Sequence, residues 1–208
     1  NAYYCREGVP AEAIVHAGPN IWVGIFALQY TAQTKDTQYL GLAEEIAQAI
    51  IAMQSADPEG GIKGGPGVQW YATEHNLDAY AFFGMLFTLT GQEAYRRAQE
   101  TTLAWLKAHA YDKPEIPIKR GKGDATIATD TYAWSIASLG PEKLQQLQMD
   151  PDKIMEFAAA HCEVVVDYIR PEGALLRLKG FDFAAQRNLA RGGVISAEWS
   201  AQMAIAYK

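Results

Sequence analysis

The feature that most constrains the fold is an internal repeat of paired helical segments. One constant shift along the sequence superposes Asn20 on Asn76 and Thr34 on Thr90, and apolar positions match on both sides of these residues. Such self-similarity is typical of solenoid and toroid architectures, in which each helix pair buries its apolar face against its neighbours. The sequence therefore predicts an all-α fold of repeated helical hairpins, arranged as an α/α toroid or an incomplete arc of one.

Each repeat consists of an apolar segment followed by an amphipathic one. The apolar helices are predicted over residues 20–33 and 75–89, and because they are hydrophobic around most of their circumference we expect them to be inner helices, buried on several sides. The amphipathic helices are predicted over residues 39–54 and 95–109, where one apolar stripe indicates an outer position.

A third helix pair and the start of a fourth follow. The third inner helix is predicted from Thr129, and its outer partner is predicted to begin after the capping residue Asp150 and to run through about Val166. Between them, Gly-Pro-Glu is predicted to break the helix. A fourth inner helix is predicted from near Ser196, with no stop signal behind it, so we expect the natural polypeptide to continue beyond Lys208.

The connections from each outer helix to the next inner helix are long, over residues 56–73, 111–128 and 169–195. Loops of that length usually carry function or are disordered. In a stack of hairpins all three would gather on one face, which is where we expect the functional site. The helix pairs are too few to close a ring, and we expect residues 1–208 to form a single domain of a longer chain.

Composition excludes two classes of partner. The formal net charge of -6 does not fit a nucleic-acid-binding surface, which needs clustered basic residues. No apolar run approaches the roughly 20 residues that span a bilayer, so we expect a soluble chain without a membrane span. Cys5 and Cys162 belong to no metal-ligand motif and are predicted to be buried thiols rather than a disulfide.

Acidic residues stand near the starts of the predicted inner helices. Glu74 and Asp78 are four residues apart, so both carboxylates project from one face of their helix. Asp130 and Glu198 begin the third and fourth inner helices. A structural explanation is available for some of them, because a carboxylate favours a helix N-terminus, with Thr73 as the cap beside Glu74 and Asp130 itself as a cap. Asp78 lies among apolar residues and needs partners or a cavity.

Paired carboxyl groups are what glycosidic cleavage requires, since one protonated acid serves the leaving oxygen and one carboxylate serves as base or nucleophile. Glu74, Asp78, Asp130 and Glu198 are therefore the catalytic candidates. Flat aromatic rings with polar neighbours bind sugar faces, although about half of these rings are expected in the core. The predicted substrate-binding residues are Trp22, Trp70, Tyr71, His75, Asn76, Asp124, Tyr132, Trp134 and Trp199.

Other chemistries are disfavoured by spacing. The acidic residues around His75 lack the HExxH arrangement of a metal site, and GGIKGGPG and RGKGD lack phosphate-loop spacing, so neither a metal nor a cofactor is predicted. The glycine-rich segments are predicted to be flexible loops across a cavity mouth. Loop cations could pair with an acidic sugar, with the site carboxylates, or only with solvent; they are Lys119, Arg120, Lys122, Arg187 and Arg191.

Three segments, GGPGVQWYATEHNLDAY, GKGDATIATDTYAW and ISAEWSAQMA, resemble the loop-to-inner-helix segments of bacterial (α/α) toroid proteins thought to act on glycans. The architectural resemblance covers most of the chain. It implies an oligo- or polysaccharide partner, with glycoside hydrolysis as the leading activity. A polysaccharide lyase or sugar epimerase, with a His or Tyr base, stays open, as does a non-catalytic repeat module that binds glycan or protein. Compartment and oligomeric state are left open.

Overall fold

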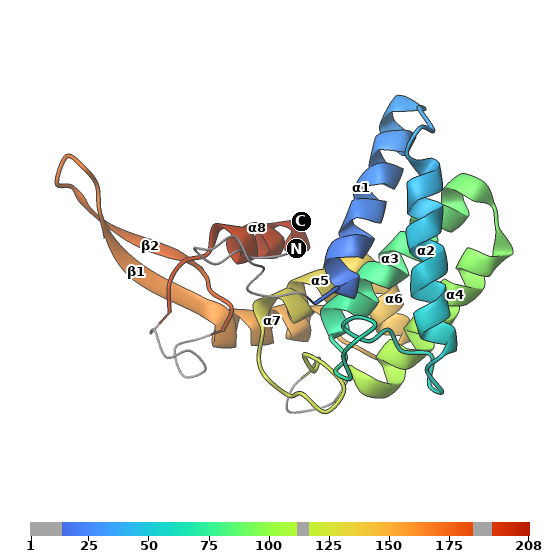
Figure 1. Ribbon diagram of the computed structural model, residues 1–208. Helices are drawn as coiled ribbons and strands as arrows, with labels where there is room; N and C mark the ends of the chain where they lie inside the picture. The colour runs from blue at the N-terminus through green and yellow to red at the C-terminus, as the bar shows by residue number, and fades with distance from the viewer. Residues whose placement is uncertain (1–13, 112–116, 185–192) are drawn as a thin grey trace. The chain divides into compact units, whose positions relative to one another are not determined.

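The structure is a computed structural model that describes residues 14–111, 117–184 and 193–208. It is mainly helical and divides into two compact units, Asn1–Ala108 and His109–Lys208. In chain order the elements are α1 (Ala17–Thr34), α2 (Leu40–Ser55), α3 (Thr73–Thr90), α4 (Glu93–His109), α5 (Thr129–Leu139), α6 (Pro141–Gln146), α7 (Pro151–Cys162), β1 (Glu163–Ile169), β2 (Leu175–Phe181) and α8 (Ala197–Ala206) (Figure 1). The single domain stays a prediction.

The first unit contains the two predicted hairpins. Helix α1 packs against both α2 and α3, and their apolar residues form one core. The amphipathic outer helix is confirmed in α2, which buries Ala43, Ala47 and Ile50 along one stripe. Helix α4 joins the unit through the Gln54 side chain of α2, which donates to the Thr102 hydroxyl at 2.9 Å.

The internal repeat is confirmed in the hydrogen bonds of the inner helices. Asn20 Nδ2 donates to the backbone carbonyl four residues before it at 2.7 Å, and Asn76 Nδ2 does the same at 2.9 Å. The hydroxyls of Thr34 and Thr90 each donate to the carbonyl four residues earlier at 2.8 Å. Superposed sequence positions thus have superposed local structure, which is the expected result of a duplicated unit.

The ends of the two inner helices are also equivalent, although their residues differ. Lys35 and Gly91 each follow the helix in the left-handed conformation, with φ of 64° and 68°. Each donates its backbone N–H to the carbonyl four residues earlier, at 2.9 Å and 2.8 Å. Glycine takes this conformation without steric cost, whereas lysine does not.

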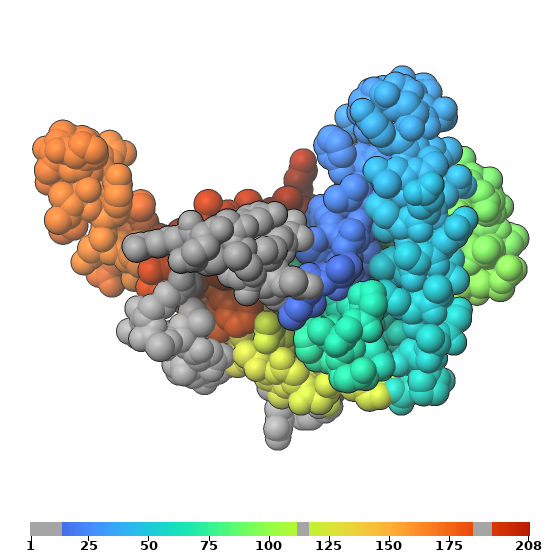
Figure 2. Space-filling model, in the orientation of Figure 1, coloured from blue at the N-terminus to red at the C-terminus, as the bar shows by residue number. Residues whose placement is uncertain are grey.

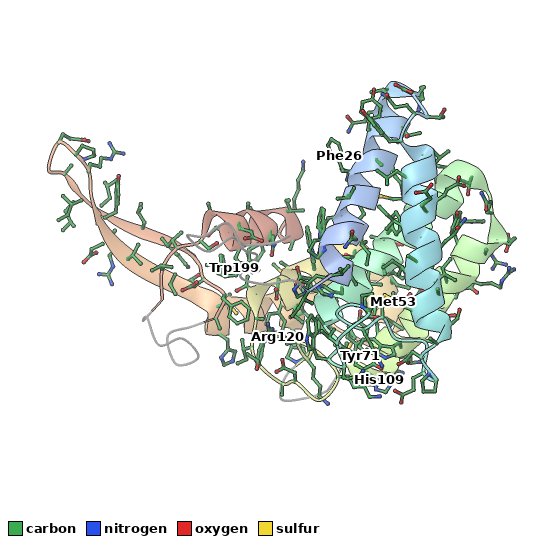
Figure 3. All side chains as sticks on the ribbon, in the orientation of Figure 1. Phe26, Met53, Tyr71, His109, Arg120 and Trp199 are labelled. Atoms are coloured by element: carbon green, nitrogen blue, oxygen red, sulfur yellow. The ribbon has the colours of Figure 1, made fainter. Side chains whose placement is uncertain are left out.

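The expectation that α1 is buried on several sides is only partly met. Its contacts with α2 and α3 bury residues such as Ile21 and Leu28, but Trp22, Val23 and Phe26 are exposed, Phe26 by 68% (Figure 3). Apolar residues around the whole helix therefore do not imply cover on every side.

The second unit places α5 against α6, α7 and α8. Asp150 caps α7 as predicted, because its side chain accepts the backbone N–H groups of Asp152 and Lys153. The predicted helix break at Gly-Pro-Glu is confirmed, because α5 ends at Leu139, and Pro141 then opens the short helix α6. Proline suits the first position of a helix because its φ is already helical and its missing N–H is not needed there.

The predicted helix through Val166 is also wrong, because α7 ends at Cys162 and a β-hairpin follows. Strands β1 and β2 pair antiparallel, with Glu163 opposite Phe181 and Ile169 opposite Leu175. β-Branched residues lose side-chain freedom in a helix and pack well on a pleated strand. The end of the hairpin stands clear of the rest of its unit (orange in Figure 2).

None of the helices in the described ranges is long and apolar enough to cross a membrane. Cys162 is a buried free thiol, as predicted, whereas Cys5 lies outside the described residues.

Candidate active site

Three of the four predicted acidic residues occupy the same place in their helices. Glu74, Asp130 and Glu198 are the second residues of α3, α5 and α8. The capping explanation given for two of them is wrong, because the residues at the cap positions of α3 and α5 are alanines without a side-chain cap hydrogen bond. The helix α8 has such a cap in Ser196. Neither Glu74 nor Asp130 is at a cap position, although the Asp130 carboxylate accepts the backbone N–H of Thr131 in the first turn of α5 at 2.6 Å.

The start of α5 is tied to the segment that follows β2. Thr129 donates its backbone N–H to the Phe183 carbonyl at 2.8 Å, and its hydroxyl donates to the carbonyls of Asp182 and Phe183. Thr129 is fully buried. The residue directly after it, Asp130, is thus held at a fixed place relative to the end of the hairpin.

Asp130 and Glu198 come together because α5 packs against α8. Asp130 is partly buried and Glu198 is exposed. Burial of the Asp130 carboxyl raises its pKa above the usual value, and the negative charge of Glu198 raises it as well, whereas hydrogen bonds from Thr131 and the positive charge of Arg120 only partly offset this. A carboxyl group whose pKa is raised, beside a second carboxyl group, has the make-up of an acid–base pair.

Aromatic and basic residues surround this pair. The Phe183 ring lies 5.4 Å from the ring of Trp199, which directly follows Glu198. The guanidinium of Arg120 lies over the Phe183 ring, 5.3 Å from the centre of that ring. Arg120 and Trp199 are labelled in Figure 3. Predicted candidates from two separate loops thus meet at the starts of α5 and α8.

Asp124, a predicted substrate-binding residue, is already engaged with its own loop. Its carboxylate accepts the backbone N–H of Thr126 at 2.9 Å and forms an ion pair with Arg120 at 3.3 Å. Burial by itself would raise the pKa of Asp124, but these two partners lower it overall. The RGKGD segment is therefore an internally bonded turn, in which Gly121 and Asp124 also exchange backbone hydrogen bonds, rather than the flexible loop predicted.

Asp182 is a site residue that the sequence did not indicate. It is fully buried, and its two carboxylate oxygens accept the backbone N–H groups of Phe183 at 2.8 Å and Val194 at 2.7 Å. It connects the end of β2 with the segment leading to α8. The only available signal was an acidic residue between two phenylalanines, which has no meaning until the hairpin is known.

In the first unit, Asp78 and Glu74 lie on α3, where Asp78 is buried with 2% exposure and Glu74 is partly buried. Asp78 thus occupies the buried place that the sequence pattern predicted. These two residues and the pair Asp130 and Glu198 belong to different units. The expectation that all four share one face stays a prediction.

Two imidazoles flank an exposed tryptophan near the start of α3. The ring of Trp70 lies 5.9 Å from that of His16 and 5.6 Å from that of His75, and Trp70 is 45% exposed. Burial lowers the pKa of His75 to about 4, and the electrostatic effect of the neighbouring His16 contributes in the same direction. The imidazole of His75 is therefore neutral near pH 7 and is a weak base. Gly18 leaves room for it, because a Cβ there would lie 2.6 Å from His75 Nε2.

Two predicted binding residues hold the loop before α3. Asn76 is fully buried, and its amide accepts the N–H of Ile62 and donates to the Ile62 carbonyl, both at 3.0 Å. Tyr71 donates its hydroxyl to Asp57 and stacks on Trp105 at 5.5 Å. Both side chains bond the protein itself, so the glycine-rich loop is pinned rather than flexible.

The remaining aromatic candidates divide as expected between core and surface. Tyr132 is fully buried, and its ring packs 5.4 Å from that of Phe157, which makes it a core residue that cannot stack on a sugar. Trp134 is partly buried and Trp22 is 39% exposed. Arg187 and Arg191 lie outside the described residues.

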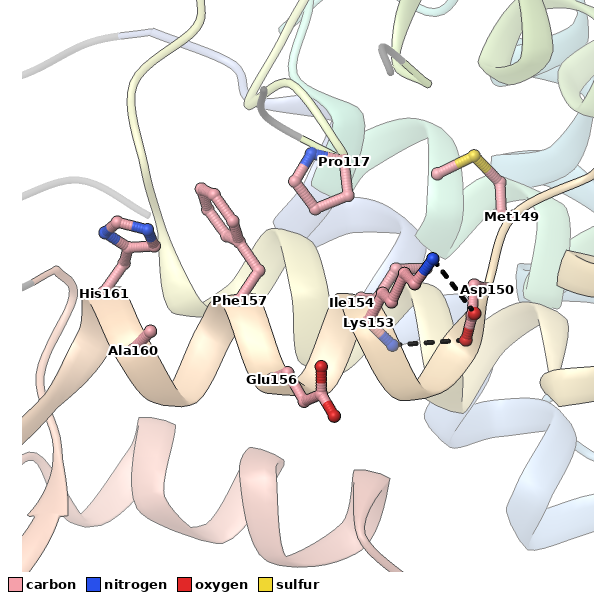
Figure 4. A pocket seen from close by; sticks show the side chains of 9 residues that line it. All are labelled: Pro117, Met149, Asp150, Lys153, Ile154, Glu156, Phe157, Ala160 and His161. Atoms are coloured by element: carbon pink, nitrogen blue, oxygen red, sulfur yellow. Dashed lines mark hydrogen bonds and ion pairs between the residues drawn. The ribbon is translucent and has the colours of Figure 1, made fainter. Parts of the chain in front are cut away.

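A cavity of about 590 Å³ lies along α7, and none of the predicted site residues lines it (Figure 4). Phe157 and His161 form its aromatic end, with ring centres 4.1 Å apart, and Lys153 lies beside Asp150 at its other end. Two carboxyl residues, Asp150 and Glu156, also line this cavity, but the Asp150 carboxylate is bonded to the backbone N–H groups of Asp152 and Lys153. Within the described residues, no group of three or more His, Cys, Asp or Glu side chains is placed to hold a metal ion.

No protein-family model and no curated protein sequence matches the chain. Its fold is similar to a family 76 glycoside hydrolase (mannosidase) from Bacteroides thetaiotaomicron VPI-5482, with a TM-score of 0.61 and 14% identity over 99% of this chain and 56% of that one. It is also similar to a family 76 glycoside hydrolase from a bovine Bacteroides thetaiotaomicron strain, with a TM-score of 0.57 and 15% identity over 99% of this chain and 44% of that one. The chain thus spans about half the length of these structures. At this identity the likeness shows the fold, which is that of the α/α toroid proteins the sequence resembles.

Proposed function

We propose that this chain carries the carboxyl pair of a glycoside hydrolase, with Asp130 as the acid and Glu198 as the base or nucleophile. The observation that carries the proposal is the packing of α5 against α8, which brings Asp130 near Glu198; burial and the charge of Glu198 both raise the pKa of the Asp130 carboxyl. In this mechanism Asp130 gives its proton to the leaving glycosidic oxygen. Glu198 either takes a proton from the attacking water or bonds to the anomeric carbon first.

The surroundings of the pair support a sugar as the substrate. Trp199 and Phe183 present aromatic rings beside the two carboxyl groups, and such rings stack on the apolar faces of sugars. The fold likeness to family 76 glycoside hydrolases supports the same class, and the word mannosidase in one description makes mannose-containing glycans the first substrates to test. Asp78 and Glu74 are the second candidate pair.

The test uses four variants on a panel of oligosaccharides that begins with mannose-containing glycans. We expect Asp130→Asn and Glu198→Gln each to lower kcat by about 100-fold or more, because each removes one proton-transfer or bond-forming group. Asp78→Asn and Glu74→Gln are assayed beside them. Binding, followed by calorimetry, should persist in the carboxyl variants.

A matched control comes from the outer helix α7, where Asp152 is also the second helical residue and is exposed. Asp152→Asn changes the charge at the same helical position outside the pair and should keep full activity. The proposal fails if the unmodified protein turns over no glycan, or if Asp130→Asn and Glu198→Gln both retain full activity. Binding without turnover would instead indicate a glycan-binding module.

A further inference from the structure

Arg120 is an exposed cation whose position is restrained by two partners, an aromatic ring and a carboxylate. Its side chain is 48% exposed, yet the guanidinium lies 5.3 Å from the centre of the Phe183 ring and 3.3 Å from Asp124 Oδ2. A planar guanidinium stacks on an aromatic ring and pairs with a carboxylate in a defined geometry, unlike the flexible ammonium of lysine. Arg120 is therefore held in one place despite its exposure.

That place is set by the same residues that build the carboxyl pair. The Phe183 carbonyl accepts the N–H of Thr129, directly before Asp130, and the Phe183 ring contacts Trp199, directly after Glu198. Phe183 thus joins the starts of α5 and α8, and Arg120 covers its ring. A cation held on this ring is also held near the first turns of α5 and α8.

The charges near Asp130 show what such a cation does. Burial and Glu198 favour the protonated form of Asp130, and Arg120 favours the ionised form. An acid catalyst must release its proton in one step and recover it in another, so neither form should be too stable. The charged groups that act on Asp130 are Arg120 on the loop and Glu198 on α8, and its hydrogen-bond partner is Thr131 on α5.

We propose that Arg120 is a positioning residue of the carboxyl pair: held by Phe183 and Asp124, it stabilises the ionised form of Asp130 beside Glu198. The inference rests on the proposed function for its catalytic meaning, but the electrostatic part can be measured without any substrate. It also gives Asp124 a task, namely to orient Arg120 rather than to bind the sugar.

The experiment is an NMR titration of the Asp130 carboxyl carbon in the unmodified protein, in Arg120→Gln and in Arg120→Lys. We expect the pKa of Asp130 to rise by about one unit in Arg120→Gln, because a neighbouring positive charge is removed. Arg120→Lys keeps the charge without the stacking geometry and should give a smaller rise. Glu198→Gln removes a negative charge and should lower the pKa instead.

Arg96→Gln is the matched control, because Arg96 on α4 is also about half exposed, at 47%, and forms an ion pair with Glu100 four residues away. It should leave the Asp130 titration unchanged. Where turnover is found, Arg120→Gln should move the alkaline limb of kcat upward by the same shift, with KM little changed.

An unchanged Asp130 titration in a folded Arg120→Gln protein overturns the inference, even if both carboxyl groups prove essential. A shifted titration in a protein without turnover upholds the electrostatic role and rejects the hydrolase. If Arg120→Gln does not fold, Arg120→Lys and Phe183→Leu decide in its place: an unchanged pKa in both contradicts the proposal, and a rise in both supports it.

Discussion

At the scale of single residues, burial sets the charge of side chains more strongly than sequence neighbours do. His75 is 8% exposed and its pKa is lowered to about 4, although Glu74 precedes it in the sequence. This has a consequence for function, because a polysaccharide lyase or epimerase would need a stronger base at that position. The hydrolase proposal needs no proton transfer by His75.

The lowered pKa of His75 predicts a specific pH dependence of stability. The stability that the buried, neutral His75 contributes is fully present above pH 6.5, the pKa of the unfolded state. It is lost as the pH falls toward about 4, the pKa of His75 in the folded state. The whole shift corresponds to on the order of 3 kcal/mol. We expect the free energy of unfolding, measured with urea between pH 7 and pH 4, to fall less steeply in His75→Gln than in the unmodified protein. His109→Gln, at the end of α4, is the control; an equal slope in His75→Gln contradicts the account.

Tyr71 provides a second test at this scale. The pKa of Tyr71 is raised to about 12; burial is the largest cause, and the hydrogen bond to Asp57 is the second. We expect Tyr71→Phe to lower the free energy of unfolding by about 1 kcal/mol at pH 7, because the Asp57 carboxylate loses one partner. The difference from the unmodified protein should vanish as the pH rises from 10 through 12. Tyr39→Phe, at an exposed residue, should leave the free energy of unfolding unchanged. A similar decrease in that variant would contradict the stabilising role assigned to the Tyr71 hydroxyl.

Single residues were predicted where their position along a helix was informative. Asp130 and Glu198 follow from acidic residues at predicted helix starts, and Asp78 from a carboxylate in an apolar helix. Phe183 and Asp182 could not be found in this way, because their roles depend on contacts with residues far away in the sequence. Tyr132 was misjudged because an aromatic residue near a helix start has the same pattern whether it faces the core or a cavity.

At the scale of elements, the helices of the repeat were predictable because their periodicity and stop signals are local. The hairpin β1–β2 was not, since Val164 to Val166 extends the apolar pattern of α7 and a short apolar run fits helix and strand equally. Pairing with residues 175–181 decides between them, and pairing is not visible in either segment alone. The face of β1 that carries Val164 and Val166 pairs with Gly180 and Leu178, which completes one apolar face.

Because the ends of α1 and α3 are equivalent, introducing a glycine at one end should stabilise the protein, and replacing the glycine at the other end should destabilise it. Lys35→Gly should raise the free energy of unfolding by about 0.5 to 1 kcal/mol, because the residue has a left-handed conformation that glycine takes at no steric cost. Gly91→Ala should lower it by about 1 kcal/mol for the same reason. Lys107→Gly, inside α4, is the control and should be destabilising. Thermal unfolding measures all three, and destabilisation by Lys35→Gly would contradict the equivalence of the two ends.

At the scale of the whole molecule, acidic residues at helix starts occur in both units. The fold likeness to the family 76 structures extends over 99% of this chain and over about half of each of those structures. The pair within one unit, Asp130 and Glu198, is the part of the proposed site that packing and electrostatics support directly. Glu74 and Asp78 extend the proposal to the other unit. The central claim is that Asp130 and Glu198 act together on one glycosidic bond.

The most direct measurement is kcat/KM of the double variant Asp130→Asn/Glu198→Gln on the best glycan substrate, compared with both single variants. Residues that act as one catalytic unit show strongly non-additive losses. If the two carboxyl groups form one acid–base pair, kcat/KM of the double variant should lie within about threefold of that of the slower single variant, which is the usual scatter of such cycles. Losses that multiply would show two independent roles and would contradict the claim that the two carboxyl groups form an acid–base pair.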